Sequence, residues 1–532
     1  MLIFGFTLVV ICFGNSQIPF DTYHWPNTLQ AEDGAGSVWP QPASMTSTSE
    51  TFRVDAREFA FTLAANSHTC DILLEAIKRY ELIIYKTSVN MHLKFYPTEK
   101  IVKTLVIDLV SKCEEYPSES MVEAYTLDIS ENSILYSESV WGILRGLESF
   151  SQLMYTNSVG DVLLNSTHIV DFPRFSFRGI MIDTSRHYLT LDVILKNIDA
   201  MAYNKLNVLH WHIVDNEAFP YVSQTFPDIS EKGSYRPSTH IYTPEAVQTV
   251  IEYARLRGIR VVPEFDTPGH TESWGKGQLD LLTPCYSNGK LNGRFGPINP
   301  TLDSTYVFID ALWKEIKSVF PDNYLHLGGD EVDFSCWRSN PDINKWMDAR
   351  NISGQYAMLE QHYIQEVIEI SNRLGFSYIV WQEVIDNGVK AKQDTIVDVW
   401  KNNPSVDREI ARITALGYRV LVSQPWYLNY ISYGSDWKKY YLYDPTNFKG
   451  TDAQKALVMG GEACMWGEYV DSTNILPRLW PRAGAVAERL WSPKDVTDTN
   501  DATLRLHQQR CRMLQRGIPA EPIWKGSCDY DF

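Results

Sequence analysis

Several features that would place this 532-residue chain in a common class are missing from it. No basic run exceeds two residues, and 65 acidic against 48 basic residues give a formal charge of −17, so the footprint of a nucleic-acid-binding protein is absent. No C-x-x-C pair occurs, which argues against a zinc or thioredoxin-like site. The longest apolar run, residues 2–13, is too short to span a bilayer. With 44% apolar and 21% charged residues, the composition indicates a globular protein with a large core.

The short apolar run is typical of a secretory signal peptide. It ends in small residues at 14–16, so we expect a signal peptide over 1–16 that is cleaved before Gln17. The alternative is a buried N-terminal helix. Acceptor tripeptides for N-glycosylation begin at Asn165 and Asn351, and they fit a secretory route.

The cysteines bear on the same route. Cys12 lies in the predicted signal peptide, and Cys464 stands apart from six others that fall into three local couples. Six cysteines allow fifteen connectivities, so the residues alone leave the pairing open, although pairing within the couples is the simplest choice. Disulfides in an oxidising compartment are the favoured interpretation. The couples are Cys70 with Cys113, Cys285 with Cys336, and Cys511 with Cys528.

The first part of the mature chain predicts a small α/β domain over residues 17–171. Residues 105–110 are typical of a strand, and residues 140–155 carry apolar side chains at helical spacing. Residues 34–51 are rich in Ser, Thr, Pro and Gly, and we expect an exposed loop there. The segment Asp171-Phe-Pro173 interrupts the pattern, so a second domain is predicted over 172–532.

The second domain has a β/α rhythm. Between most of its apolar runs lie amphipathic helical stretches, as at 191–204, 244–257, 303–319 and 355–374. Parallel strands that are buried on both faces lose polar alternation, so this pattern predicts a (β/α)8 barrel. The helix after the seventh strand is poorly defined. The eight predicted strands are 177–186, 206–215, 259–266, 324–331, 377–383, 395–400, 419–427 and 457–468.

The carboxyl ends of barrel strands carry the chemistry of this fold. Here they are acidic and aromatic, without a lysine or a phosphate-binding glycine motif, which indicates acid–base hydrolysis of a neutral substrate. Indole faces beside carboxylates suit a sugar ring, which has apolar faces and hydroxyl edges. The residues at these ends are Arg186, Asp215, Asp266, His270, Asp330, Glu331, Trp381, Glu383, Trp400, Trp426, Tyr427, Trp466 and Glu468.

The segment 325–331 is the most specific of these motifs. Two glycines let the backbone turn as the strand ends, and the adjacent Asp330 and Glu331 follow; the competing interpretation is a solvated acidic loop. Adjacent residues point to different sides of a strand, so the pair is poorly placed to act as a facing acid and nucleophile. One would then be the acid and the other a helper, and a neighbouring acetamido group of the substrate would be the nucleophile.

Three histidines allow alternatives. His210 and His212 share one strand face and could hold a metal in a metal-dependent barrel hydrolase, but packed core histidines are favoured because both lie below the strand end. His270 could tune or relay protons beside Asp215 or Glu331, or be a turn histidine in water. A catalytically inactive sugar-binding barrel is the other rival.

The chain resembles glycoside hydrolase family 20, in particular its animal lysosomal β-hexosaminidases, over nearly all of the mature sequence. Its length and Asn429 make it more similar to the α-type chains. The segments that carry the resemblance are RGIMIDTSRHY at 178–188, MAYNKLN at 201–207, HLGGDEVD at 326–333, PWYLN at 425–429 and GEACMWGE at 461–468.

The resemblance implies a role for each site residue. It implies that Glu331 is the general acid/base, that Asp330 orients the 2-acetamido group, and that Tyr427 donates a hydrogen bond to the acetamido carbonyl. The other implied roles are a supporting dyad for Asp215 and His270, sugar walls for Trp381, Trp400 and Trp466, hydroxyl binding for Arg186 and Glu468, and a contact at the 6-position for Asn429.

The resemblance also implies properties of the whole protein. It implies an exo-acting, retaining β-N-acetylhexosaminidase without metal or cofactor, an accessory first domain, a homodimer or a heterodimer with a related subunit, and a lysosomal or secreted location. The family's three disulfides fall on the couples above and leave Cys464 free. One departure is Tyr430, which stands where α-type chains have Arg, so action on acidic substrates is not implied.

Overall fold

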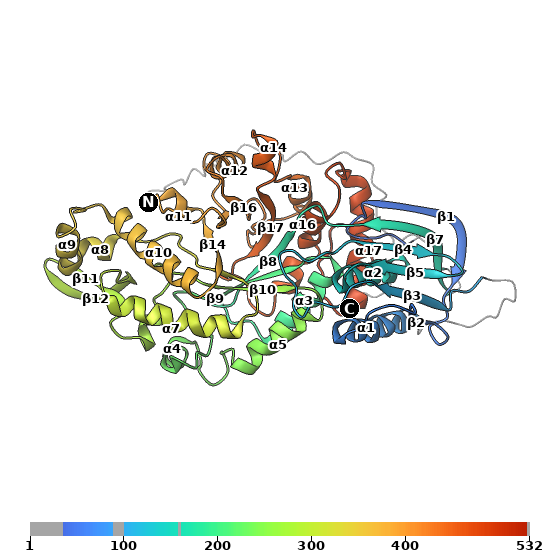
Figure 1. The fold of residues 1–532 in the computed structure, drawn as a ribbon, viewed down its shortest axis with the longest axis horizontal. Helices are drawn as coiled ribbons and strands as arrows, with labels where there is room; N and C mark the ends of the chain where they lie inside the picture. The colour runs from blue at the N-terminus through green and yellow to red at the C-terminus, as the bar shows by residue number, and fades with distance from the viewer. Residues whose placement is uncertain (1–35, 89–99, 158–160, 529–532) are drawn as a thin grey trace, which may run out of the picture.

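The computed structural model describes residues 36–88, 100–157 and 161–528, so the predicted signal peptide lies outside the described residues. The first part of the chain is built on a seven-stranded mixed sheet of order β1-β7-β4-β5-β3-β2, with β6 paired to β7 (Figure 1). Its strands are β1 (Ser44–Arg53), β2 (Ala60–Leu63), β3 (Thr104–Leu109), β4 (Tyr125–Ile129), β5 (Ser133–Ser137), β6 (Tyr155–Thr156) and β7 (Val162–Asp171).

Two helices pack on this sheet, α1 (Asp71–Ser88) and α2 (Val140–Leu153). The Ser139 hydroxyl accepts a hydrogen bond from the Gly142 amide at the start of α2, a favourable N-cap. Every residue of α2 is buried, because the helix contacts the sheet and α1 and also donates and accepts hydrogen bonds with the second part of the chain.

The prediction of a loop over 34–51 is wrong, because β1 occupies its second half and pairs antiparallel with β7. Most of β1 is exposed, so it has little apolar patterning, and its alternating Ser and Thr residues are compatible with an edge strand.

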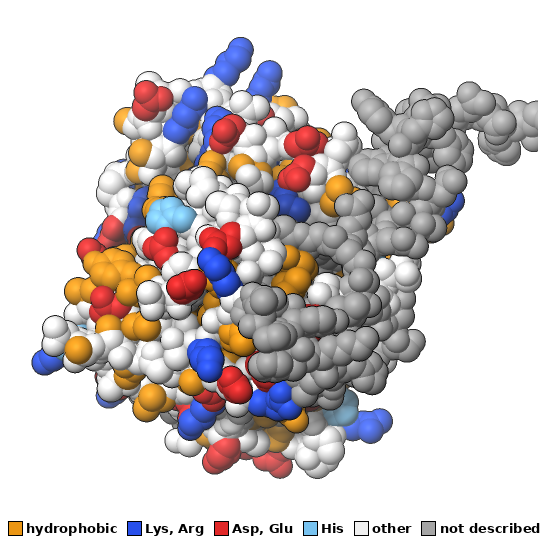
Figure 2. All heavy atoms as spheres, turned by 90° about the vertical axis from the view of Figure 1, so that its right-hand side faces the viewer, with side chains coloured by type: hydrophobic (Ala, Val, Ile, Leu, Met, Phe, Trp, Pro, Cys, Tyr) orange, Lys and Arg blue, Asp and Glu red, His pale blue; other side chains and the backbone are white. Residues whose placement is uncertain are grey.

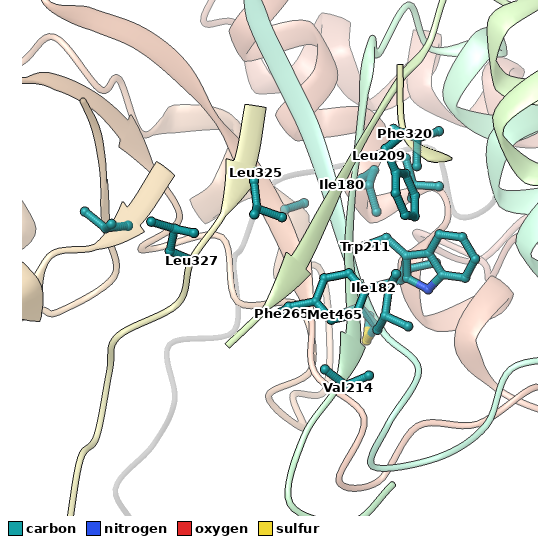
Figure 3. Packing of buried hydrophobic residues seen from close by; sticks show 14 of the residues in the cluster. Ile180, Ile182, Leu209, Trp211, Val214, Phe265, Phe320, Leu325, Leu327 and Met465 are labelled. Atoms are coloured by element: carbon teal, nitrogen blue, oxygen red, sulfur yellow. The ribbon is translucent and has the colours of Figure 1, made fainter. Parts of the chain in front are cut away.

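The second part of the chain is a closed, parallel, eight-stranded barrel, which confirms the predicted fold class. Strand residues point alternately into the barrel and toward the surrounding helices, and both sets are buried, which explains the continuous apolar runs. Figure 3 shows part of the layer between strands and helices, with Trp211, Phe265 and Leu325 among the packed side chains. The strands are β8 (Phe177–Asp183), β9 (Val208–Val214), β10 (Arg260–Phe265), β13 (Tyr324–His326), β14 (Ser377–Trp381), β15 (Ile396–Val399), β16 (Arg419–Val422) and β17 (Val458–Met465).

Helices surround the barrel, and a two-stranded hairpin of β11 (Leu282–Ser287) and β12 (Lys290–Ile298) projects from the loop after β10 (Figure 1). The connection from β16 to β17 contains only the short helices α13 (Trp437–Leu442) and α14 (Asp452–Lys455), which agrees with the weak helical signal in this part of the sequence. The helices are α3 (Leu191–Tyr203), α4 (Pro227–Gly233), α5 (Pro244–Arg255), α6 (Trp274–Gly277), α7 (Asp303–Val319), α8 (Ser335–Ser339), α9 (Pro341–Asp348), α10 (Tyr356–Arg373), α11 (Glu383–Asp386), α12 (Val406–Ala415), α13 (Trp437–Leu442), α14 (Asp452–Lys455), α15 (Ile475–Leu479), α16 (Arg482–Trp491) and α17 (Thr499–Gln515).

All eight barrel strands end before the predicted residue, and the difference is largest, five residues, for β13 and β16. β13 stops at His326 because Gly328 and Gly329 adopt positive φ values and turn the chain. β16 stops at Val422, and the chain rejoins the sheet only where Tyr427 forms a bridge to Cys464 of β17. In both cases the predicted functional residues lie on the loop beyond the strand.

The structure contains disulfides Cys70–Cys113, Cys285–Cys336 and Cys511–Cys528, as the couples predict, and Cys464 is free and buried. Within the described ranges, no helix has the length and apolar character needed to cross a membrane. The face in Figure 2 carries acidic and basic side chains intermixed on its described surface.

Candidate active site

The two predicted catalytic carboxylates lie on the loop that follows β13. Gly328 leaves room for the Asp266 carboxylate, because a Cβ atom there would lie 1.7 Å from Asp266 Oδ1. The same oxygen accepts a 2.7 Å hydrogen bond from the Gly329 amide. Asp330 is buried, whereas the Glu331 side chain is 59% exposed and its backbone has a φ of 50°. The turn thus presents one carboxylate at depth and one at the mouth of the site.

His270 and Asp215 form the predicted dyad beside these carboxylates. His270 Nδ1 lies 3.0 Å from Asp215 Oδ1, and His270 Nε2 lies 3.8 Å from both Asp330 Oδ2 and Glu331 Oε2. Arg186 Nη2 lies 2.8 Å from Asp215 Oδ2, and its Nη1 lies 3.1 Å from Asp183 Oδ2. A continuous chain of charged groups therefore connects Arg186 to Glu331.

The charges of this chain follow from its geometry. Burial would lower the pKa of His270, but the carboxylates of Asp330 and Asp215 raise it to about 9. Burial would raise the pKa of Asp215, yet its contacts with His212 and His270 hold it well below the usual range. Burial together with Asp330 raises the pKa of Asp266 well above its usual value. At mildly acidic pH the site therefore contains a cationic His270 and an anionic Asp215, while its surroundings favour the protonated form of Asp266.

Aromatic side chains form one wall of the site. The rings of Trp381 and Trp466 have centroids 6.1 Å apart, and those of Tyr427 and Trp466 are 6.4 Å apart. Trp400 packs with Trp466 against a small cluster that includes Tyr427 and Cys464. The Arg186 guanidinium lies over Trp466, 5.0 Å from the ring centroid. The predicted walls and the predicted acetamido donor are thus contiguous.

Beneath the wall lies a buried polar layer that is centred on Glu264. One Glu264 oxygen accepts a 2.8 Å hydrogen bond from Trp381 Nε1 and lies 3.2 Å from His326 Nδ1. The other oxygen lies 2.6 Å from His212 Nδ1 and 2.9 Å from His210 Nε2. His212 Nε2 in turn lies 2.8 Å from Asp215 Oδ2. Glu264 therefore connects a sugar wall to the dyad.

Both histidines of the metal-dependent alternative contact buried carboxylates in this layer. His210 lies between Glu264 and Glu462, whose charges outweigh burial and raise its pKa to about 10. Burial also opposes the charged form of His212, but Glu264 and Asp215 raise its pKa well above the usual value. Both histidines are therefore buried and held by carboxylates below the strand end, which is the arrangement of packed, hydrogen-bonded core histidines.

Four of the predicted residues contain a buried polar atom that has no hydrogen-bond partner within the described chain. Such atoms also occur elsewhere in the described chain, but these four belong to residues around one site, where a polar ligand would pair with them. The atoms are His270 Nε2, Asp330 Oδ1, Trp400 Nε1 and Asn429 Oδ1.

Two predicted residues are less tightly held. Asn429 lies two residues beyond Tyr427, and its carbonyl accepts a hydrogen bond from Arg478. Glu468 follows β17 and is exposed, and none of its side-chain atoms has a hydrogen bond or ion pair within the described residues. Their predicted contacts therefore depend on a substrate.

Sequence reasoning missed two positioning residues, Glu264 and Asp183. Asp183 accepts hydrogen bonds from the Ser185 and Gly467 amides and holds Arg186. Both residues occupy apolar strands of the barrel. A lone carboxylate in a strand that is otherwise apolar was the available signal.

Comparison with known proteins agrees with this geometry. Residues 175–494 match the model "Glycosyl hydrolase family 20, catalytic domain", and residues 38–153 match "beta-acetyl hexosaminidase like". Beta-hexosaminidase subunit alpha of Bos taurus is 51% identical over 94% of this chain and 96% of its own length; subunit beta of Homo sapiens is 52% identical over 93% and 90%. These identities do not separate the two types, so the greater similarity to α-type chains stays a prediction.

A solved structure, the GH20 exo β-N-acetylglucosaminidase from Vibrio harveyi in complex with N-acetylglucosamine, superposes with a TM-score of 0.76 at 25% identity and covers 94% of this chain and 80% of its own. Barrel, accessory sheet and catalytic segment therefore match one family together. The chain is a glycoside hydrolase and belongs to glycoside hydrolase family 20.

Proposed function

We propose that this enzyme removes terminal β-linked N-acetylglucosamine or N-acetylgalactosamine from glycans, with retention of configuration and with the substrate's acetamido oxygen as nucleophile. The observation that carries the proposal is the set of unpartnered polar atoms at His270, Asp330, Trp400 and Asn429 beside an aromatic wall. An N-acetylated sugar offers the amide, carbonyl and hydroxyl groups to pair with them. The names of the relatives support the same activity.

Asp330 is placed to orient the nucleophile. Its Oδ1 atom is buried without a partner, so the acetamido N–H can donate to it, and its negative charge stabilises the positive charge that develops as the acetamido oxygen attacks the anomeric carbon. Tyr427 donates a hydrogen bond from its hydroxyl group to the acetamido oxygen. Burial holds the pKa of Tyr427 well above its usual value, so this donor stays protonated.

Glu331 supplies the proton transfers. In the first step its carboxylic acid protonates the glycosidic oxygen as the anomeric C–O bond breaks and the acetamido oxygen closes an oxazolinium ring. In the second step the Glu331 carboxylate takes a proton from water, whose oxygen attacks the anomeric carbon and reopens the ring. The product keeps the β configuration, and no sugar becomes attached to the protein.

The product's configuration and the enzyme's covalent state test this mechanism. Proton NMR of early time points should show the β-anomer, intact-protein mass spectrometry should show no added sugar, and a matched β-glucoside without the acetamido group should be almost inert. A glycosyl-enzyme adduct, or equal turnover of the glucoside, contradicts the mechanism. Binding of N-acetylglucosamine without turnover would support the inactive sugar-binding alternative.

Assembly and location belong to the same proposal. Relatives named as alpha and beta subunits support a dimer, either of two copies or with a related subunit, and light scattering of the purified protein tests this. The predicted signal peptide and the three disulfides support a secretory route that ends in the lysosome or outside the cell. We expect N-glycans at the exposed Asn351 and at Asn165, which mass spectrometry of the secreted protein can locate.

A further inference from the structure

The proposed reaction has a leaving group, and the structure contains a cavity on the side of Glu331 where that group must lie. The cavity has a volume of about 400 Å³ and is lined by Glu331, His270, Glu272 and the β12 residues Arg294 and Phe295. None of the three wall tryptophans lines it. Because the acid protonates the glycosidic oxygen, it stands between the terminal sugar and the leaving group. The cavity therefore lies beyond the bond to be cleaved.

A second cavity continues the first. It has a volume of about 840 Å³ and shares Glu272, Arg294 and Phe295 with it. Its lining includes Leu279, which is 74% exposed, and Phe295, which is 55% exposed. Exposed apolar side chains beside a polar cleft are typical of a sugar subsite, where the ring's C–H face covers them.

The wall that carries Phe295 is held in place. The hairpin of β11 and β12 is tied to α8 by the Cys285–Cys336 disulfide, and Gly296 lies so close to Cys336 that a Cβ atom at 296 would be 2.5 Å from the Cys336 Cβ. A fixed wall loses little entropy when it binds a ligand.

The polar groups at the junction of the cavities indicate the charge of the ligand. Within the described residues, neither the Arg294 guanidinium nor the Glu272 carboxylate has an ion pair or a side-chain hydrogen bond, so both are available to a ligand. One cation and one anion at the same place suit hydroxyl groups, which both donate and accept, better than a polyanion. Asp333 adds a further negative charge to the first cavity, and Lys276 and Asp280 add one charge of each sign to the second.

We propose, on the basis of the function proposed above, that the two cavities form a groove that binds the second and following neutral sugars of an oligosaccharide, with Phe295 as the stacking platform. The enzyme would then prefer chain ends of extended neutral glycans over substrates with small leaving groups.

The test compares three substrates of full-length enzyme: methyl β-N-acetylglucosaminide, chitobiose and chitotetraose. KM should fall along this series. Phe295→Ala should raise KM for chitotetraose about five- to tenfold, which corresponds to loss of an aromatic contact, and should leave kcat/KM for the methyl glycoside unchanged. Phe295→Trp should restore the wild-type series.

Leu291→Ala is the matched control, because Leu291 is 65% exposed on the same β12 strand but lines neither cavity. The groove proposal is overturned if Phe295→Ala and Leu291→Ala change KM for chitotetraose equally, or if KM does not depend on chain length. If an oligosaccharide that contains uronic acid binds more tightly than chitotetraose, the preference of the groove for neutral sugars is contradicted. Failure of the wild-type enzyme to cleave all three substrates contradicts the proposed function instead.

Discussion

Two regions of this molecule bury charged groups, and only one of them has histidines as its main cations. Between the accessory sheet and the barrel, Glu123 binds Arg178 at 2.6 Å and Arg145 at 2.8 Å, and Asp171 binds Lys205 at 2.7 Å. Under the active site, Glu264 and Asp215 are instead surrounded by His210, His212, His270 and His326.

The difference separates a structural role from a functional one. Arginine stays charged at every physiological pH, so the pairs that Glu123 forms at the interface are permanent contacts between the two parts of the chain. A histidine can lose its proton, and against burial the neighbouring carboxylates raise the pKa of His210 to about 10 and that of His270 to about 9, so this layer ties its geometry to the proton concentration above neutral pH. We therefore expect mutations at the interface to change stability and mutations at the barrel layer to change turnover.

The largest expected effect is on turnover and concerns Glu331, which lies 3.8 Å from His270. Glu331→Gln removes the proton donor but keeps the size of the side chain, so kcat should fall by about 10² to 10⁴ while the affinity for product is retained. Steady-state kinetics and calorimetry with N-acetylglucosamine measure the two quantities. Turnover within tenfold of wild type would remove Glu331 from the role of acid/base.

The matching change at the interface should affect stability. Glu123→Gln leaves two buried guanidinium groups without their anion, and breaking a buried pair costs about 3–5 kcal/mol. Denaturant unfolding should show this loss, while kcat of the folded fraction stays at the wild-type value. The control is Glu119→Gln, which removes a partly exposed contact with Arg419 and should cost about 0–1 kcal/mol. Equal losses in the two variants would contradict a special role for the interface.

The pH dependence of stability separates the two regions directly. Burial disfavours charge on His210, but Glu462 and Glu264 raise its pKa to about 10. The contribution of His210 to the free energy of unfolding is therefore complete below pH 6.5 and is lost as the pH rises toward 10. Burial and Glu462 raise the pKa of Asp398, so this group also makes the protein less stable as the pH rises. Burial would raise the pKa of Glu264, but His212 and His326 lower it, so the contribution of Glu264 to stability is lost below pH 4.5.

The free energy of unfolding should therefore be highest between pH 4.5 and 6.5 and should decline toward pH 9, by about 1.4 kcal/mol per pH unit for each proton involved, and the melting temperature should follow it. His210→Gln should flatten this decline. Glu123→Gln should lower the curve without changing its slope, because burial is outweighed by Arg178 and Arg145, which hold the pKa of Glu123 below its usual value. A flat wild-type curve would contradict the assignment.

Glu264→Gln should lower kcat by about 10- to 100-fold, since small misplacements of catalytic groups have effects of this size. The variant keeps an acceptor for Trp381 Nε1 but loses the charge that holds His212 against Asp215. A purely structural role would leave the pH profile of kcat/KM in place, whereas we expect its limbs to shift. Glu123→Gln is again the control, with an unchanged profile.

The smallest expected effect lies outside both charged regions, at the exposed rim. Tyr430 is 57% exposed beside Tyr427, with ring centroids 5.9 Å apart, and it offers a sulfate only a neutral hydroxyl. Tyr430→Arg adds a charge-assisted hydrogen bond of about 1.5 kcal/mol or more, so hydrolysis of 6-sulfated N-acetylglucosaminides should improve about tenfold relative to the neutral substrate. Equal rates for both substrates in the wild-type enzyme would show that another cation lines this position.

Much of the barrel and of the catalytic turn was predictable because the signals are local. Eight apolar strands, the glycines before Asp330 and the aromatic strand ends can be recognised within short segments. The exposed strand β1 was not predictable, because it pairs with a partner more than a hundred residues away and has no apolar stripe. The ends of β13 and β16 were also missed, since turns decided them and apolar content did not.

The sequence by itself determined the order of strands and the chemical types of the site residues, because strand burial and glycine turns depend on neighbours along the chain. Only the tertiary structure decided that Glu264 joins three histidines to Trp381 and that Phe295 stands beyond Glu331. These contacts join strands and loops that are far apart in sequence. Closure of the barrel brings them within hydrogen-bonding distance, and burial there sets which of the groups stay charged.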